Sequence, residues 1–387
     1  MDLPFLPYGA QAIDDDDVAA VTAALRSPYL TTGPRVAEFE QAIAAQVGAQ
    51  FGVAVCNGTA ALHAACHALE LGPGDEVVVP AVTFLASANC VRYVGARPVF
   101  ADVCPDSGLM TAAHLEAAIT PRTKAVIPVH LTGRPVDLSA VRAVAERHDL
   151  QIIEDAAHAL GARYDGEPIG SCGWSEMAIF SFHPVKHMTT GEGGMIVTND
   201  GELDAGLRRF RSHGMVRDAD ALERPSPGPW YYEQQVLGFN YRITDIQCAL
   251  GLSQLKKLGG FVTRRQALAS RYDALLDGAE WVRPIDFGPA GAASAYHLYS
   301  VLIDFEAVGK TRAQVMAGLR DRGIGTQVHY IPVPHQPFYM REGWSLETFP
   351  GARAYYERTL SLPLYPRMED EDVDRTVDAV REVLLAP

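Results

Sequence analysis

Residues 181–194 read Ser-Phe-His-Pro-Val-Lys-His-Met-Thr-Thr-Gly-Glu-Gly-Gly, which places Lys186 between an apolar stretch, Met177 to Phe180, and a glycine-rich turn. Lysine is otherwise rare, since the only others are Lys124, Lys256, Lys257 and Lys310. A lysine held in such a turn loses part of its solvation, which disfavours the ammonium form and leaves an amine able to condense with an aldehyde. We therefore predict that Lys186 is a reactive amine and not a solvated surface charge.

An acidic residue, Asp155, lies 31 positions before Lys186 and ends the run Leu-Gln-Ile-Ile-Glu at residues 150–154. This run predicts a buried strand with Asp155 at its carboxyl end, the edge at which α/β sheets bind ligands. A carboxylate there can keep a pyridinium nitrogen protonated, so that the ring withdraws electrons. Asp155 is therefore the second candidate catalytic residue.

Between residues 50 and 200, short β-branched runs alternate with amphipathic stretches. We expect seven strands, near residues 53–56, 76–79, 98–100, 125–129, 151–153, 178–180 and 195–197. This alternation predicts an α/β fold in which helices wrap a mostly parallel sheet.

The chain length suits two domains. We expect residues 1–250 to form an N-terminal arm and a large domain, and residues 251–387 to form a connecting helix and a small α+β domain. The connector is a long helical pattern that begins at Thr244 and runs to about Leu275. Before it, residues 220–230 are rich in proline and charge and predict a loop.

The turn Asn57-Gly58-Thr59-Ala60 follows the first strong strand and opens a predicted helix. Amides and a hydroxyl at a helix N-terminus suit a phosphate, although most such turns are ordinary strand-to-helix junctions, and this one has neither the GxGxxG nor the Walker pattern. Ser181 either adds a second hydroxyl to the same phosphate or is an ordinary hydrogen-bonding residue at a strand end, as most lone serines in that position are. Phe84, at the end of another strand, either packs in the core or lies flat on a cofactor ring.

A phosphate-type turn, an aspartate at a strand end and a lysine before a glycine-rich turn follow one another along the chain, and together they indicate pyridoxal 5′-phosphate. Here the chain resembles the fold-type I, aspartate-aminotransferase-like enzymes, and within them the DegT/DnrJ/EryC1/StrS family of sugar aminotransferases. The resemblance covers nearly the whole chain and is carried by residues 29–34, 57–62, 154–158, 181–186, 191–194 and 238–245.

The resemblance implies catalysis by Lys186, which would bind the cofactor covalently, and by Asp155, which would pair with the pyridine nitrogen. It also implies contacts with the cofactor from eight residues: Gly58, Thr59, Phe84, Asp155, His158, Ser181, Lys186 and Asn240. Among them, His158 would lie near the ring hydroxyl, and Asn240 would come from a neighbouring subunit. A homodimer with shared active sites is therefore implied.

Within the family, the chain is most similar to the branch that makes UDP-4-amino-4,6-dideoxy-N-acetyl-β-L-altrosamine on the way to pseudaminic acid, judged by residues 6–9, 181–194 and 325–332. This similarity implies transfer of an amino group from L-glutamate to the C4 ketone of a UDP-2-acetamido-2,6-dideoxy-4-keto-hexose. The expected substrate contacts are Tyr8, Thr32, Arg242, His329 and Tyr330. Residues 333–339 depart from the pattern of that branch, so a dTDP-4-keto-6-deoxyhexose and a 3-keto sugar stay as alternative substrates.

Two other functions compete with amino transfer. A sugar dehydratase of the same fold has histidine in place of the lysine, so the presence of Lys186 favours transfer. A regulator that uses the fold as a ligand sensor needs an added DNA-binding module, but the family-like region begins within the first ten residues. The net charge of −14 also opposes binding to nucleic acid.

The composition of the sequence bears on the cellular location of the protein and on metal binding. No run approaches the ~18 apolar residues of a membrane span, and Met1-Asp2-Leu3-Pro4 lacks the features of a signal peptide. The six cysteines form no CxxC pair and predict reduced thiols without a zinc site. The acidic run at residues 14–17 favours a helix start over a metal site. We expect a cytoplasmic enzyme with no bound metal and no membrane partner.

Overall fold

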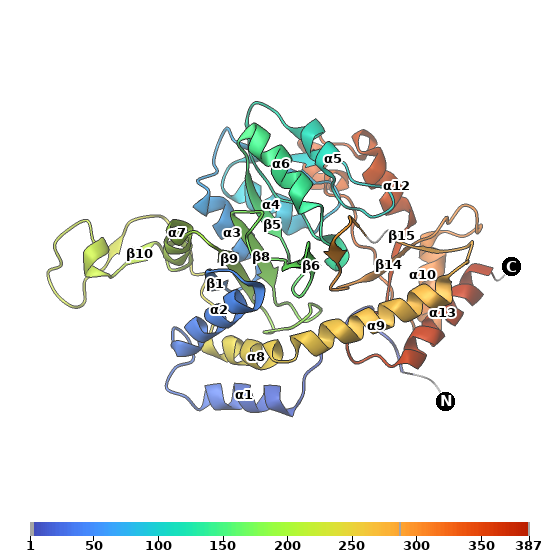
Figure 1. Cartoon of the computed structure of the whole chain (residues 1–387), viewed down its shortest axis with the longest axis horizontal. Helices are drawn as coiled ribbons and strands as arrows, with labels where there is room; N and C mark the ends of the chain where they lie inside the picture. The colour runs from blue at the N-terminus through green and yellow to red at the C-terminus, as the bar shows by residue number, and fades with distance from the viewer. Residues whose placement is uncertain (1–3, 286–287, 386–387) are drawn as a thin grey trace.

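The computed structural model of the protein describes residues 4–285 and 288–385. Within these residues a seven-stranded sheet forms the centre of the molecule and confirms the expected α/β fold (Figure 1). In spatial order its strands are β1 (Phe51–Val55), β9 (Gly194–Thr198), β8 (Met177–Ser181), β5 (Gln151–Asp155), β4 (Thr123–Val126), β2 (Glu76–Pro80) and β3 (Arg97–Ala101).

The direction of the strands creates the edge at which the site lies. The pairs β2–β3, β2–β4, β4–β5 and β5–β8 are parallel, whereas β9 is antiparallel to both of its neighbours. The carboxyl ends of the parallel strands therefore meet at one edge. Asp155 ends β5 there in register with Ile179 of β8, and Ser181 ends β8.

Helices of the N-terminal half pack around this sheet and on one another. They are α1 (Asp15–Leu25), α2 (Pro34–Val47), α3 (Gly58–Ala68), α4 (Leu85–Tyr93), α5 (Ala112–Ala118), α6 (Leu138–His148), α7 (Gly201–Arg211) and α8 (Asp245–Leu255). Several start at a side-chain cap, as the sequence indicates. Asp14 accepts a hydrogen bond from the backbone N–H of Asp17, so the acidic run is a helix start.

The C-terminal part builds a second hydrophobic core. Its elements are α9 (Leu258–Leu276), β12 (Arg283–Pro284), β14 (Tyr299–Leu302), α10 (Arg312–Asp321), α11 (Pro337–Arg341), α12 (Pro350–Arg358), β15 (Thr359–Leu362) and α13 (Asp370–Leu385). Tyr272 and Tyr299 stack in this core at 4.4 Å between ring centroids, and Leu6 of the N-terminal arm joins it. The division of the chain at residue 250 stays a prediction.

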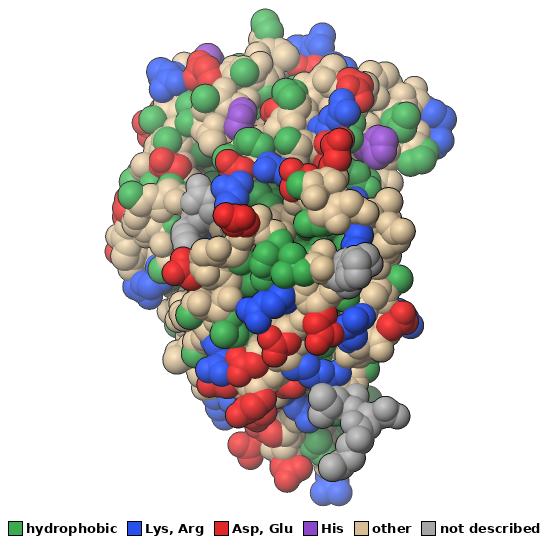
Figure 2. All heavy atoms as spheres, turned by 90° about the vertical axis from the view of Figure 1, so that its right-hand side faces the viewer, with side chains coloured by type: hydrophobic (Ala, Val, Ile, Leu, Met, Phe, Trp, Pro, Cys, Tyr) green, Lys and Arg blue, Asp and Glu red, His purple; other side chains and the backbone are tan. Residues whose placement is uncertain are grey.

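The surface of the C-terminal part mixes both signs of charge. Figure 2 shows this side, where Lys and Arg side chains are interspersed with Asp and Glu over the lower half. Ion pairs such as Arg264–Asp370 at 2.8 Å and Arg322–Glu382 at 3.0 Å join its helices. Exposed pairs of this kind contribute only about 0–1 kcal/mol each, so the apolar core carries the stability.

The connector between the two cores is not the single helix that the sequence predicts. α8 ends at Leu255 and α9 begins at Leu258, so this part of the prediction is wrong. Lys257 lies at the break, where its Nζ reaches Asp14 Oδ1 at 2.6 Å and Asp17 Oδ1 at 2.8 Å. Gly259 and Gly260 follow at once, and glycine costs about 1 kcal/mol in a helix interior. The tertiary ion pairs and weak propensity together favour a break here.

Residues 215–234 leave the body of the molecule as an extended excursion beyond α7 (Figure 1). Its base is the short pair β10 (Met215–Val216) and β11 (Glu233–Gln234). The Glu233 carboxylate accepts hydrogen bonds from the backbone N–H groups of Glu223 and Arg224 and from the Tyr231 hydroxyl. This carboxylate therefore closes the loop that the sequence predicts at residues 220–230.

A small separate sheet and four short turns complete the fold of the described residues. β6 (Arg163–Tyr164), β7 (Glu167–Pro168) and β13 (Ala292–Ala293) form a separate small sheet. Short 3-10 turns lie at Leu131–Gly133, Ala219–Ala221, Val333–His335 and Leu346–Thr348.

No helix in the two described ranges is long and apolar enough to cross a bilayer. The expectation that the chain lacks a leader concerns residues 1–4, of which 1–3 lie outside the described residues.

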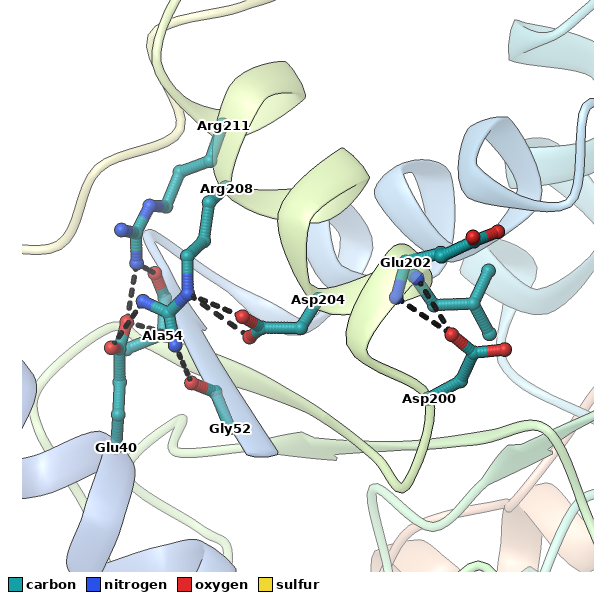
Figure 3. A network of polar contacts seen from close by, with 9 residues as sticks. Glu40, Gly52, Ala54, Asp200, Glu202, Asp204, Arg208 and Arg211 are labelled. Atoms are coloured by element: carbon teal, nitrogen blue, oxygen red, sulfur yellow. Dashed lines mark hydrogen bonds and ion pairs between the residues drawn. The ribbon is translucent and has the colours of Figure 1, made fainter. Parts of the chain in front are cut away.

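A buried carboxylate joins α2, β1 and α7 (Figure 3). Glu40 of α2 accepts hydrogen bonds from Arg208 at 2.7 Å and Arg211 at 2.5 Å, and from the backbone N–H of Ala54 at 3.0 Å. Both arginines also donate to carbonyl groups of β1, at Gly52 and Ala54. Such a charge is tolerated only while its partners stay in place. The network therefore fixes the position of α7 against the sheet.

Candidate active site

A cavity of about 430 Å³ opens at the carboxyl edge of the sheet. Nine residues expected in the site line it: Tyr8, Gly58, Thr59, Phe84, Asp155, His158, Ser181, Lys186 and Tyr330. The remaining lining residues are Asn57, Leu62, Thr83, Ala86, Val129, Ala157, Ile179, His183, Val185 and Glu192. Segments more than 300 positions apart in the sequence thus meet in one space.

Lys186 lies in the turn that follows β8, where its backbone N–H donates to the carbonyl of His183 at 2.9 Å. Burial lowers the pKa of its amine from 10.5 to about 8, although the charge of Asp155 opposes this shift. A substantial fraction of the amine is therefore neutral near pH 8, as a nucleophile or a base requires.

Asp155 is buried, with only 6% of its surface exposed, and two donors hold its carboxylate. The Ser87 hydroxyl donates to Oδ2 at 2.6 Å, and the backbone N–H of Ala157 donates to Oδ1 at 3.2 Å. A carboxylate held from the protein side presents its remaining lone pairs to the cavity in a fixed direction.

The N-terminus of α3 offers free backbone N–H groups to an anion beside Ser181, an arrangement that we call the α3 seat. The Asn57 side chain caps the helix by accepting from the N–H of Ala60 at 2.8 Å, while the N–H groups of Gly58 and Thr59 have no acceptor within the helix. A Cβ added at Gly58 would lie 3.0 Å from Cβ of Ser181. Glycine at this position therefore lets Ser181 lie directly against the N-terminus of α3, where a phosphate would bind.

His158 and Tyr330 form one wall of the cavity. The backbone N–H of Thr132 donates to His158 Nδ1 at 3.3 Å, and His158 Nε2 lies 3.1 Å from the Tyr330 hydroxyl. Burial, followed by the nearby charge of Lys186, holds the pKa of His158 well below 6.5. The ring is therefore neutral at pH 7, and because Nδ1 accepts, Nε2 carries the proton.

Phe84 lies at the mouth of the cavity and is not a core residue, since 55% of its surface is exposed. Its ring centroid is 5.9 Å from that of Tyr330, with a tilt of 54° between the planes. Of the two interpretations that the sequence allows, packing in the core is therefore wrong. The stacking interpretation stays a prediction.

Four expected site residues lie outside this cavity in the described chain. Thr32 and Arg242 line a second cavity of about 260 Å³, next to Glu40, Arg208 and Arg211. Asn240 is exposed and forms an isolated β-bridge with Ser212. His329 is buried behind Tyr8, with 5.3 Å between ring centroids, and its Nδ1 is 2.8 Å from the Ser361 hydroxyl.

Sequence reasoning missed several residues of the site. Thr83, Glu192 and His183 line the cavity, and Ser87 touches Asp155 from below the surface. The spacing of two hydroxyl residues by four positions is the signal that could have pointed to Thr83 and Ser87, whereas His183 and Glu192 lie within the quoted residues 181–194 but carry no distinguishing signal there. The atypical residues 333–339 do not line the cavity among the described residues.

Pyridoxal 5′-phosphate requires an amine for its aldehyde, a carboxylate for its ring nitrogen and donors for its phosphate. Lys186, Asp155 and the α3 seat supply these groups to one cavity, so the residues present fit the cofactor. Together with the mostly parallel sheet and the second core, the site defines a PLP-dependent transferase of fold-type I.

The chain belongs to the DegT/DnrJ/EryC1/StrS aminotransferase family, whose model matches residues 11–381. It is 43% identical over 383 residues to the spore coat polysaccharide biosynthesis protein SpsC of Bacillus subtilis (strain 168), a match that covers 98% of this chain and 97% of SpsC. The protein is a PLP-dependent sugar aminotransferase.

Solved structures of similar proteins agree with this assignment. Spr1654 from Streptococcus pneumoniae in its PMP form superposes with a TM-score of 0.91 at 32% identity, covering 98% of this chain and 99% of that chain. Its PLP form gives a TM-score of 0.90 at 31% identity, covering 98% of both chains. Helicobacter pylori PseC, an aminotransferase involved in the biosynthesis of pseudoaminic acid, gives 0.89 at 31%, covering 98% of this chain and 99% of PseC.

Proposed function

We propose that this sugar aminotransferase moves an amino group from L-glutamate to the C4 ketone of a nucleotide-linked 4-keto-6-deoxy sugar, in particular UDP-2-acetamido-2,6-dideoxy-4-keto-hexose. The observation that carries the proposal is the convergence of Lys186 and Asp155 in one cavity whose lining also includes Tyr8, Phe84 and Tyr330. The similarity to PseC supports the choice of sugar. We assign the enzyme to the pseudaminic acid branch on the same ground.

The family resemblance and the positions of the cavity residues support the following roles. Lys186 would hold the cofactor covalently and, once displaced by the donor, would move a proton between two carbon atoms as a neutral amine. Asp155 would accept the hydrogen bond of a protonated ring nitrogen. Bound pyridoxal phosphate would supply electron withdrawal from the carbon that loses the proton. Running these proton transfers in reverse on the sugar ketone completes a ping-pong reaction.

The remaining residues of the proposed site would bind and orient the cofactor and the sugar substrate. Gly58, Thr59 and Ser181 would hold the phosphate at the α3 N-terminus, and Phe84 would cover one face of the ring. His158 would donate from Nε2 toward the ring hydroxyl, a direction that its contact with Thr132 favours. Tyr8 and Tyr330 would contact the sugar, and Thr32, Arg242 and His329 are further substrate contacts in the proposal.

We further propose a homodimer in which each active site takes residues from both subunits. Asn240 and Arg242 are not at the cavity of their own chain in the described structure, yet the family resemblance assigns them to a site. Apolar side chains beside them are exposed, with 80% of Leu237 and 41% of Phe239 accessible. A second copy that covers this surface would bring Asn240 to its partner's cofactor phosphate.

Mixing two inactive variants tests the shared site. Lys186→Ala and Asn240→Ala proteins, exchanged to random dimers, are expected to recover about a quarter of wild-type activity, since half of the dimers would hold one intact site of two. As the matched control, Lys186→Ala mixed with Asp155→Ala should recover nothing, because both of these residues belong to the same subunit's site. Absence of recovery in the first mixture, despite exchange verified by mass spectrometry, would exclude the shared site.

A panel of keto sugars tests the substrate. The enzyme is loaded with glutamate to its aminated cofactor form and offered UDP- and dTDP-linked 4-keto and 3-keto sugars, while the cofactor absorbance is followed. We expect rapid return of the starting spectrum with UDP-2-acetamido-2,6-dideoxy-4-keto-hexose and a slower return with dTDP sugars. A response to dTDP sugars alone would refute the choice of nucleotide.

We also assign the enzyme to the cytoplasm. Its six cysteines are scattered without a CxxC pair, and chains without a disulfide framework are typical of a reducing compartment.

A further inference from the structure

We propose that Ser87, supported by Thr83, is a positioning residue that fixes the carboxylate of Asp155 toward the ring nitrogen of the cofactor. The proposal rests on the role of Asp155 given above and adds a residue to it. Ser87 does not line the cavity, so it would act only through Asp155.

Both hydroxyls are buried in a way that leaves them little choice of partner. Ser87 is 0% exposed and Thr83 is 1% exposed. Three possible acceptors lie near Ser87 Oγ: Asp155 Oδ2 at 2.6 Å, Thr83 Oγ1 at 2.8 Å and the carbonyl of Phe84 at 3.4 Å. The short contact to an ionised oxygen is much the stronger, so the serine proton lies on the carboxylate side.

This assignment determines the direction of the next hydrogen bond. Thr83 Oγ1 lies 2.8 Å from Ser87 Oγ. Because the single proton of Ser87 is used toward Asp155, Thr83 must donate and Ser87 must accept. The result is a directed chain from Thr83 to Ser87 to Asp155, in which each bond polarises the next.

The segment that holds these hydroxyls also links the proposed ring contact of Phe84 to the carboxylate of Asp155. Thr83 and Phe84 lie in the turn that links β2 to α4, with Phe84 at the N-cap, and Ser87 lies in the first turn of α4. This segment therefore sets both the ring proposed to cover the cofactor face and the hydroxyl that holds the carboxylate at its nitrogen. A shift of this segment would move both contacts together.

Removing the Ser87 hydroxyl should change how the proton is shared between the ring nitrogen and Asp155. A hydroxyl that donates to a carboxylate favours its ionised form. Without it, the shared proton should move from the ring nitrogen toward Asp155, and the carboxylate should lose its fixed orientation. The ring would then withdraw electrons less well, which slows proton removal without weakening the binding of glutamate.

Three serine variants form the experiment: Ser87→Ala, Ser87→Thr and Ser175→Ala. Ser175 is the matched control, because its hydroxyl donates at 2.5 Å to a different buried carboxylate, Glu154, which is the neighbour of Asp155 in β5. Each variant is loaded with pyridoxal phosphate labelled with ¹⁵N in the ring. The readouts are the ¹⁵N chemical shift, the visible circular dichroism of the bound cofactor, and kcat and KM of the glutamate half-reaction.

Ser87→Ala should move the ¹⁵N signal toward that of an unprotonated ring and lower kcat about tenfold with KM for glutamate nearly unchanged. Ser87→Thr should retain the wild-type signal, and Ser175→Ala should lower thermal stability without changing the signal. A wild-type signal in Ser87→Ala, or an Ala-like signal in Ser87→Thr, would overturn the proposal. If Ser87→Ala does not fold, Thr83→Val tests the proposal instead. A smaller change of the ¹⁵N chemical shift in the same direction would support the hydrogen-bond chain, and an unchanged ¹⁵N chemical shift would refute it.

The same experiment separates this proposal from the one on which it rests. Asp155→Asn is measured alongside, and only the glutamate half-reaction is used, so the identity of the sugar does not enter. A changed ¹⁵N signal in Asp155→Asn with none in Ser87→Ala would refute the role of Ser87 alone. No change in either variant would refute the role of Asp155.

Discussion

Replacing Lys186 by alanine is expected to lower kcat by about 10²- to 10⁴-fold, the range that a positioned acid–base group contributes, with further loss from the missing covalent link. The substitution should leave the fold intact, because Lys186 Nζ makes no ion pair or hydrogen bond among the described residues and faces the cavity. Activity is measured with glutamate as donor, and folding is followed by thermal unfolding.

Chemical labelling identifies the amine directly. Borohydride reduction of the loaded enzyme followed by peptide mass mapping should place the cofactor on Lys186. Lys124→Ala is the matched control, because this lysine is exposed on β4, and its loss should change neither labelling nor activity. An adduct on any other lysine would disprove the assignment.

The pH dependence of cofactor capture provides a second check on the same residue. Burial lowers the pKa of Lys186 to about 8, so the neutral amine becomes more abundant as the pH rises through about 8. The rate at which cofactor-free enzyme captures pyridoxal phosphate should therefore rise from pH 6 to 8 and level off above about 9. An ordinary lysine would continue to gain rate up to about pH 10.4.

Replacing Asp155 by alanine is expected to lower kcat by about 10²- to 10³-fold, as the loss of one preorganised charge-stabilising group does. The ring nitrogen would lose the carboxylate that keeps it protonated, and cofactor binding should weaken. Asp155→Asn, which keeps the shape but not the charge, should be similarly slow while it retains more of the fold. Near-wild-type turnover of either variant with the cofactor still bound would contradict the role of Asp155.

The strands and the two catalytic candidates were predictable because their signals are local. Each strand of the central sheet contains a short apolar run; Asp155 follows one such run directly, and Lys186 lies in the turn after another. The break between α8 and α9 was not predictable, because it depends on Lys257 reaching Asp14 and Asp17, more than 200 positions away. Periodicity alone continues a helix through such a point.

The second layer of the site escaped prediction for a related reason. Ser87 is a small polar residue inside α4, where a serine has no distinctive sequence signal. Only the fold, which places the start of α4 beside the carboxyl end of β5, brings its hydroxyl to Asp155. Phe84 was ambiguous in the sequence because core packing and ring stacking use the same side chain, and its exposure in the fold removes one of them.

Two adjacent carboxylates of β5, Glu154 and Asp155, have different surroundings, and the register of the strand determines which of them faces the cavity. Glu154 accepts from Ser175, and its Oε2 is 2.9 Å from His130 Nε2, whereas Asp155 faces the cavity. Successive side chains of a strand point to opposite faces, so a slip of one residue would exchange them. Glu154, longer by one methylene, would then protrude into the cofactor space, and Asp155 would be too short to reach His130. The buried partners of Glu154 therefore fix the register of the strand. Which of the two carboxylates faces the cavity is thus determined by contacts on the opposite face of the sheet.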